Sequence, residues 1–134
     1  MINTIFENIQ DHLSMLDLAV HCTERINIFA KNEDLDRVIS ETENRDRIVN
    51  IVGVLQKEVE NQINQLTASD ITQEGLSILK AWFHDLSIWS ERMILIDQET
   101  VELLAQQKEN TTKEIGLIFK NKEMFKGYNL EGKK

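Results

Sequence analysis

The sequence predicts an all-α fold, an elongated antiparallel helical bundle in which a long helical hairpin packs with a third long helix and a short C-terminal helix. Three observations support this prediction. The 134 residues include no proline and only five glycines, so few positions oppose a helix. Apolar residues recur at alternating steps of three and four, the period of an amphipathic helix. Turn-forming residues are sparse, and the length suits a single domain over 1–128 with a flexible tail at 129–134.

The first two helices are expected at about 4–30 and 33–66. Thr4 and Glu7 have the spacing of a capping box, and Asn32 suits both a left-handed C-cap and the next N-cap. A connection this short makes the two helices antiparallel neighbours. The first helix has its apolar face at Ile2, Ile5, Ile9, His12, Leu16, Ala19, Thr23, Ile26 and Ala30. The second has its face at Leu35, Val38, Thr42, Arg45, Val49, Val52, Gln56, Val59, Ile63 and Leu66.

The third helix is expected at about 70–107, with Ser69 or Asp70 as its cap, and the fourth at 112–125. An unbroken helix over 70–125 would be about 84 Å long, far longer than the hairpin on which it should pack. Residues 106–110 contain no apolar side chain, and Thr111 and Glu114 repeat the capping-box spacing. We therefore expect a break or bend near 108–111, with Gly127 ending the last helix.

The aromatic stretch 82–96 contains both tryptophans of the chain. Trp82, Leu86, Trp89 and Met93 form one apolar stripe, which is more often core than binding site, while Ile88 and Leu95 lie on roughly the opposite side of the helix. The last helix, a second subunit or another protein could cover that second side. The candidate partner-binding residues are Trp82, Phe83, Leu86, Ile88, Trp89, Leu95, Ile115, Phe119 and Phe125.

No pattern of catalytic residues is evident, so the chain is expected not to be an enzyme and to need no cofactor. None of the three histidines, at 12, 21 and 84, has a Glu three residues before it, so we expect no metal site of the di-iron bundle kind. The formal net charge of −8 argues against nucleic acid as a partner. No apolar run is long enough for a membrane span, and with one cysteine and no signal peptide the expected location is cytoplasmic.

Two segments resemble the small cytoplasmic export chaperones of bacterial flagella, of the FliT and FlgN kind. In residues 24–52 an apolar helix end leads through a short acidic turn at 32–36 into a second helix that carries Arg45. In residues 93–128 a helix with Asp97 and Glu99 runs into a second amphipathic segment that ends in Gly127-Tyr128. Together they cover about half of the chain.

The resemblance implies a chaperone that holds an amphipathic helical segment of a secreted flagellar protein, a filament-cap or hook-associated protein, before export. It also implies contact with the export machinery and, in some cases, a C-terminal helix that guards the client site. Whether the last helix here is a lid or part of the site stays open. The alternative hypothesis is a structural or adaptor coiled-coil domain that homodimerises, with no client.

Overall fold

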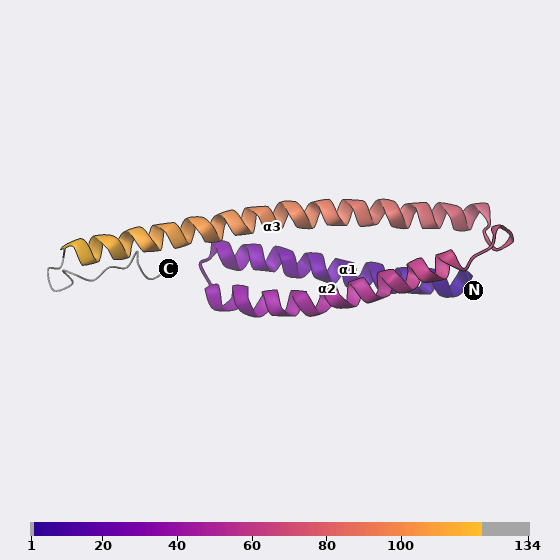
Figure 1. Cartoon of the computed structure of the whole chain (residues 1–134), viewed down its shortest axis with the longest axis horizontal. Coiled ribbons are helices and arrows are strands. Elements are labelled where there is room, and N and C mark those ends of the chain that lie inside the picture. Colours follow the sequence, from indigo (N-terminus) through magenta and orange to yellow (C-terminus); the bar gives the residue numbers. More distant parts are fainter. Residues whose placement is uncertain (1, 122–134) are drawn as a thin grey trace. The chain divides into compact units, whose positions relative to one another are not determined.

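The computed structural model describes the backbone of residues 2–121 and the side chains of residues 2–117. Over this range the fold is an all-α helical bundle, so the predicted fold class is confirmed. It consists of α1 (Ile2–Lys31), α2 (Leu35–Asn64), a short 3-10 turn η1 (Ala68–Asp70) and α3 (Gln73–Asn121) (Figure 1). The chain divides into two compact units, residues 1–100 and 101–134. None of the described helices has the length and apolarity that crossing a membrane requires.

The turn between α1 and α2 is built by Glu33 and Asp34 rather than by Asn32. Glu33 has a φ of 57°, and its N–H donates to the Ala30 carbonyl, while the Asp34 N–H donates to Phe29. These two bonds define a Schellman motif with Glu33 in the left-handed position, where glycine is usual. Asp34 then caps α2 by accepting from the Arg37 N–H at 3.3 Å. The prediction that Asn32 fills both roles is wrong, because the helix continues for one more residue.

The predicted helix starts also need correction. α1 already begins at Ile2, so Thr4 and Glu7 lie inside it and form no capping box. The capping box of the chain's described part joins Thr67 and Asp70 in η1, and the hydrogen bonds from Thr67 lower the pKa of the Asp70 carboxyl. The N-terminus of α3 is instead capped by Thr72, whose Oγ1 accepts from the Gly75 N–H at 3.0 Å.

The predicted break near 108–111 is absent, because α3 runs unbroken from Gln73 to Asn121. The second capping box at Thr111 and Glu114 is therefore wrong as well. Side chains one turn apart support the helix here: Lys113 pairs with Glu109 at 3.1 Å, and Thr112 donates to the Lys108 carbonyl at 2.9 Å. The segment is polar but has neither proline nor glycine before Gly116, so nothing in it ends a helix. The helix end at 125–127 and the tail at 129–134 lie outside the described residues.

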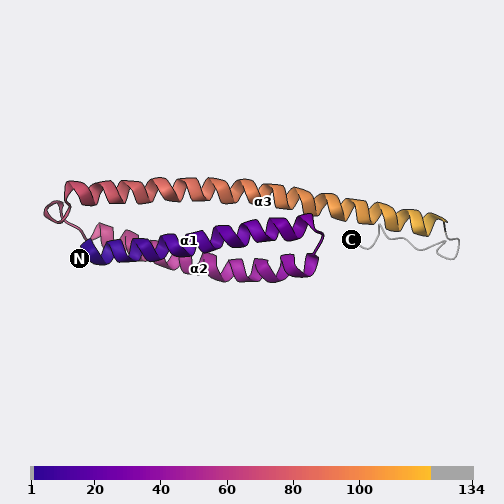
Figure 2. The same cartoon turned by 180° about the vertical axis from the view of Figure 1, so that it is seen from behind.

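The core of residues 1–100 lies where the three helices meet. α1 and α2 run antiparallel and pack closely along their length. α3 runs alongside α1 in the same direction, as both views show (Figures 1 and 2). The central cluster is formed by Ile5, Ile9, Val59, Leu79 and Trp82. Most of the predicted first-helix face is buried, as are Val38, Val52 and Val59 of the second. Leu35 and Val49, which were predicted on that same face, are exposed.

Two buried polar contacts join α1 to α3. Near one end of the unit, the Trp82 indole N–H donates to His12 Nδ1 at 3.1 Å, and the two rings meet edge to face at 5.4 Å. Near the other end, the Asn27 amide donates to Thr100 Oγ1 at 3.1 Å. Because Nδ1 accepts, the proton of neutral His12 resides on Nε2, and this buried atom has no hydrogen-bond partner.

We predict that this histidine makes the fold sensitive to acid. Burial lowers the pKa of His12 from 6.5, although Gln56 and Glu60 of α2 act in the opposite direction. Below pH 6.5 the unfolded chain therefore takes up a proton that the folded chain resists. The free energy of unfolding should fall with decreasing pH in this window, by at most about 1.4 kcal/mol per pH unit. Urea titrations from about pH 7 to 5.5, where few carboxylates titrate, will measure this slope.

The matched variant is His12→Gln, which retains an acceptor for the Trp82 indole but does not titrate. Its stability should vary less with pH than that of the wild type over the same range. Equal slopes for the two proteins would contradict the assignment of the acid sensitivity to His12.

Candidate partner-binding surface

α3 is held to the hairpin mainly by side chains rather than by close backbone approach. Only α1 and α2 approach closely among the described helices, because large residues such as Trp82 and Leu86 separate α3 from its neighbours. Three ion pairs connect α3 to the hairpin across this spacing: Arg45 with Asp97, Arg92 with Glu24 and Lys31 with Glu99. Wide spacing leaves both flanks of α3 open to solvent, and large apolar side chains lie on each.

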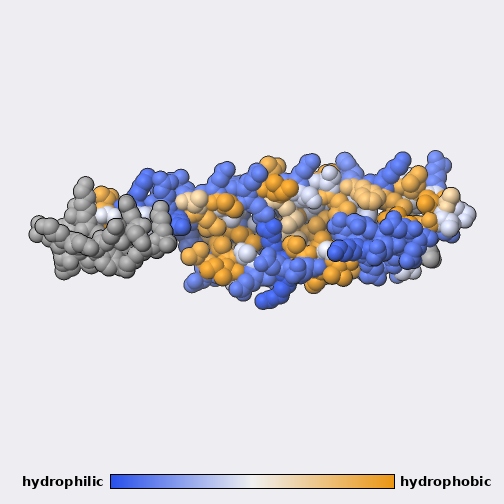
Figure 3. Space-filling view, viewed as in Figure 1, coloured by the Kyte–Doolittle hydropathy of each residue, from blue (hydrophilic) through white to orange (hydrophobic). Residues whose placement is uncertain are grey.

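The first open flank faces α2. Arg45 and Asp97 form a two-pronged ion pair between the helices, with Nη2 and Oδ2 2.7 Å apart. Val49 lies one turn inward from Arg45, and Ile94 one turn inward from Asp97, so in this antiparallel pair they occupy the same level. Both side chains are exposed, as is Phe83 three turns along α3 from Ile94. We call Val49, Phe83 and Ile94 the α2–α3 face. Apolar side chains gather between α3 and the hairpin on the side seen in Figure 3.

Two small residues lie beside the apolar residues of the α2–α3 face. Gly53 follows Val49 by one turn on α2, and Ser90 precedes Ile94 by one turn on α3, and both are exposed. No atom lies within 4 Å of the position that a Cβ on Gly53 would take. The small residues leave room beside Val49 and Ile94, so a helix with a row of apolar side chains can pack against this face.

The second open flank of α3 lies beyond the ion pairs to α1, roughly opposite the stripe that packs on the hairpin. Ile88 and Leu95, seven residues apart on α3, are 50% and 66% exposed. Leu95 and the exposed Ile28 of α1 lie between two ion pairs, Arg92–Glu24 at 2.8 Å and Lys31–Glu99 at 3.1 Å. The two pairs neutralise the charges that border this flank. The prediction that the hairpin alone does not cover Ile88 and Leu95 agrees with their exposure.

The structure separates the predicted site residues into groups. Trp82 is 1% exposed and belongs to the core, so it offers nothing to a partner in this conformation. Leu86 packs against the core cluster, and Trp89 is half-buried. Phe83 lies on the α2–α3 face, and Ile88 and Leu95 lie on the opposite flank. In the second unit Ile115 is exposed; Phe119 lies in α3 beyond the described side chains, and Phe125 lies outside the described residues.

Sequence analysis did not select Val49 and Ile94 as site residues, although it placed Val49 on the apolar face of the second helix. Val49 fits the three-four pattern of its helix, and that pattern does not show that the neighbouring helix stands too far away to cover it. The sequence feature that could have indicated these residues is the width of the apolar surface on each helix. A helix whose apolar residues extend over more than the stripe that one neighbour covers leaves a margin exposed.

No group of three or more His, Cys, Asp or Glu side chains within the described residues is arranged to hold a metal ion. Comparisons of the chain with protein-family models, with curated proteins and with solved structures find no match. Function is therefore inferred from the exposed side chains and their charges.

We predict that Gly53→Ala stabilises the protein by about 0.5–1 kcal/mol, because alanine restricts the unfolded chain and favours helix more than glycine does, and the new methyl group meets no atom. Chemical denaturation of both proteins will measure the difference. Gly75→Ala is the matched control: its Cβ would lie 3.2 Å from Thr72 Oγ1, the atom that caps α3. Gly75→Ala should therefore increase the free energy of unfolding by less than Gly53→Ala does. Equal increases for the two variants would contradict this account.

Proposed function

We propose that this chain is a non-enzymatic binding protein that holds an amphipathic helix of another protein on the α2–α3 face. One observation carries the proposal: Val49, Phe83 and Ile94 are large apolar side chains, all exposed along the same side of α2 and α3. Helix-in-groove recognition uses such surfaces, with apolar anchors of the bound helix spaced by three, four and seven residues. The aromatic Phe83 is expected to contribute most to the binding energy, because aromatic residues dominate the energy of many interfaces.

The resemblance to flagellar export chaperones supplies the identity of the client in this proposal. The bound helix would belong to a filament-cap or hook-associated protein, held in the cytoplasm before export, and the chaperone would also touch the export machinery. The acidic body supports this role, since residues 1–100 contain eighteen Asp or Glu against eight Lys or Arg, a net charge of −10. Repulsion between copies keeps a protein with exposed apolar residues dispersed until a client arrives.

The client hypothesis predicts that the purified protein forms a stoichiometric complex with a filament-cap or hook-associated protein of its own host. Phe83→Ser should weaken this complex at least about tenfold, because an apolar anchor is lost from the interface. Isothermal titration calorimetry of the two purified proteins will measure the affinity.

Ile88→Ser is the matched control, since Ile88 and Phe83 are exposed to similar extents, 50% and 54%, on opposite flanks of α3. It should leave client binding almost unchanged. If none of the host's cap or hook-associated proteins binds, or if the two variants weaken binding equally, the α2–α3 face is not the client site.

A homodimeric adaptor is the second candidate, and the exposed pair Ile88 and Leu95 favours it. Their seven-residue spacing is that of a coiled-coil seam, although two apolar residues make a short one. If this role is correct, light scattering should show a dimer that the double substitution Ile88→Asp and Leu95→Asp converts to a folded monomer. Under the client hypothesis the double variant has the same mass as the wild type and still binds the client.

A further inference from the structure

The outward side of the hairpin, away from α3, carries a second apolar surface that the proposed function does not use. On α1, Asp11, Leu18 and Arg25 follow one another at seven-residue steps and so lie on one side of the helix. On α2, Asn44, Ile51 and Glu58 do the same. The two rows meet at one end, where Arg25 pairs with Glu41 at 3.0 Å and the Asn44 amide donates to the same carboxylate at 3.3 Å.

The antiparallel register then places the other members of the rows beside each other. Leu18 lies level with Ile51, and Val54 follows Ile51 by one turn on α2. All three side chains are exposed, and Val54 has the largest exposed fraction, 67%, among the exposed large hydrophobic residues of the described chain. We call Leu18, Ile51 and Val54 the outer hairpin face. It lies on two tightly packed helices, so it is a preformed surface.

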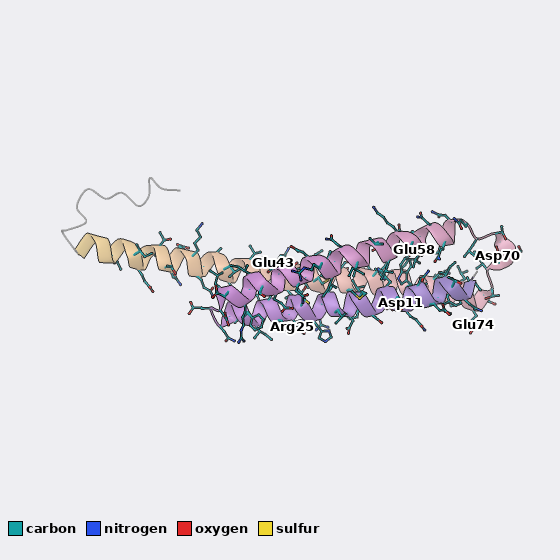
Figure 4. All side chains as sticks on the ribbon, turned by 90° about the horizontal axis from the view of Figure 1, so that it is seen from below. Asp11, Arg25, Glu43, Glu58, Asp70 and Glu74 are labelled. Carbon is teal, nitrogen blue, oxygen red and sulfur yellow. The ribbon has the colours of Figure 1, made fainter. Side chains whose placement is uncertain are left out.

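Two carboxylates face each other at the far end of this surface. The Asn8 amide donates to Gln62 Oε1 at 2.9 Å, which fixes the register; Asp11 lies one turn after Asn8, and Glu58 one turn before Gln62. Neither carboxylate takes part in any of the ion pairs found among residues 2–117. The view from below shows the labelled Asp11 and Glu58 at the same level of the hairpin, with Arg25 and Glu43 farther along (Figure 4).

The charges of the outer hairpin face differ from those around α3. Arg92 and Lys31 neutralise carboxylates on the α1–α3 flank, and Arg45 does so on the α2–α3 face. At the outer hairpin face two nearby bases are in none of the ion pairs found among residues 2–117: Arg47 lies toward the Arg25 end, and Lys57 precedes Glu58 on α2. Like charges across a tightly packed helix pair destabilise the free protein, and a cation supplied from outside would relieve this repulsion.

We infer that the outer hairpin face binds a basic amphipathic helix of another protein, whose Lys or Arg side chains border its apolar stripe at the end that meets Asp11 and Glu58. The apolar stripe covers Leu18, Ile51 and Val54, and the basic residues complement the two carboxylates. A second copy of this chain is a less favourable occupant, because the net charge of −10 over residues 1–100 opposes association between copies. The surface is separate from the α2–α3 face, so a client and this partner could be bound together.

The probe is a fluorescein-labelled amphipathic peptide of about 18 residues, roughly five helical turns, with a leucine stripe bordered at one end by lysines. A matched peptide has glutamates in place of the lysines. Fluorescence anisotropy with the full-length protein should show binding of the lysine peptide only, with an affinity that falls as salt rises from about 0.05 to 0.3 M.

Two pairs of variants locate the site. Val54→Ser should weaken binding of the lysine peptide about fivefold or more, while Leu95→Ser, at a residue of nearly equal exposure (66%) on α3, should not. Glu58→Gln should weaken binding and also raise the denaturation midpoint of the free protein, since it removes the repulsion with Asp11. Glu91 is an exposed carboxylate of α3, and Glu91→Gln should change neither peptide binding nor the denaturation midpoint.

Several outcomes would overturn the inference: equal binding of the two peptides, binding of neither, or equal losses in the variants and their controls. A dimer seen by light scattering that Val54→Ser dissociates would show that a second copy occupies the face instead. These results are independent of the client test, which depends on Phe83.

Discussion

The position of α3 on the hairpin depends on the buried contact between Trp82 and His12. A tryptophan in the core contributes several kcal/mol of apolar burial, and its loss typically costs about 3–5 kcal/mol, but apolar burial alone does not fix where one helix slides along another. The indole N–H can be satisfied only where His12 Nδ1 accepts it, and the Asn27 amide meets the Thr100 hydroxyl only in the same register. A shift by one turn would deprive the Trp82 indole and the Asn27 amide of these acceptors, so the two contacts favour one alignment of α1 and α3.

The same contact explains why so much apolar surface stays exposed. Bulky residues such as Trp82 on the side of α3 that packs on the hairpin hold it away from α1 and α2, and ion pairs rather than packed aliphatic side chains bridge the margins. Phe83 and Ile94 on one flank are consequently beyond the reach of the hairpin, whereas Ile88 and Leu95 are exposed because they lie roughly opposite the stripe that packs on it.

Much of this architecture follows from local sequence patterns. The hairpin was predictable because three-four spacing determines which side of a helix is apolar, and a short polar connection makes the two helices antiparallel; His12 was expected on the core stripe and lies in the core. The errors have a different origin. The break near 108–111 was inferred from the assumption that a helix ends where packing ends, yet all described side chains from 108 to 117 are exposed and the helix continues on its own propensity. The exposure of Val49 and the burial of Trp82 depend on the distance between helices, and no single-helix pattern contains that distance.

The distribution of charge determines how the exposed apolar residues can be used. They lie on three sides of the bundle in groups of two or three, separated by rows of charged residues, and the net charge of −10 over residues 1–100 opposes association between copies. An apolar group bordered by neutralised ion pairs selects a partner mainly by shape, because little charge is left to attract or repel it. An apolar group bordered by the unpaired carboxylates Asp11 and Glu58 also selects by charge. Two surfaces of similar apolar character on one small bundle can therefore distinguish two different helices without competing for them.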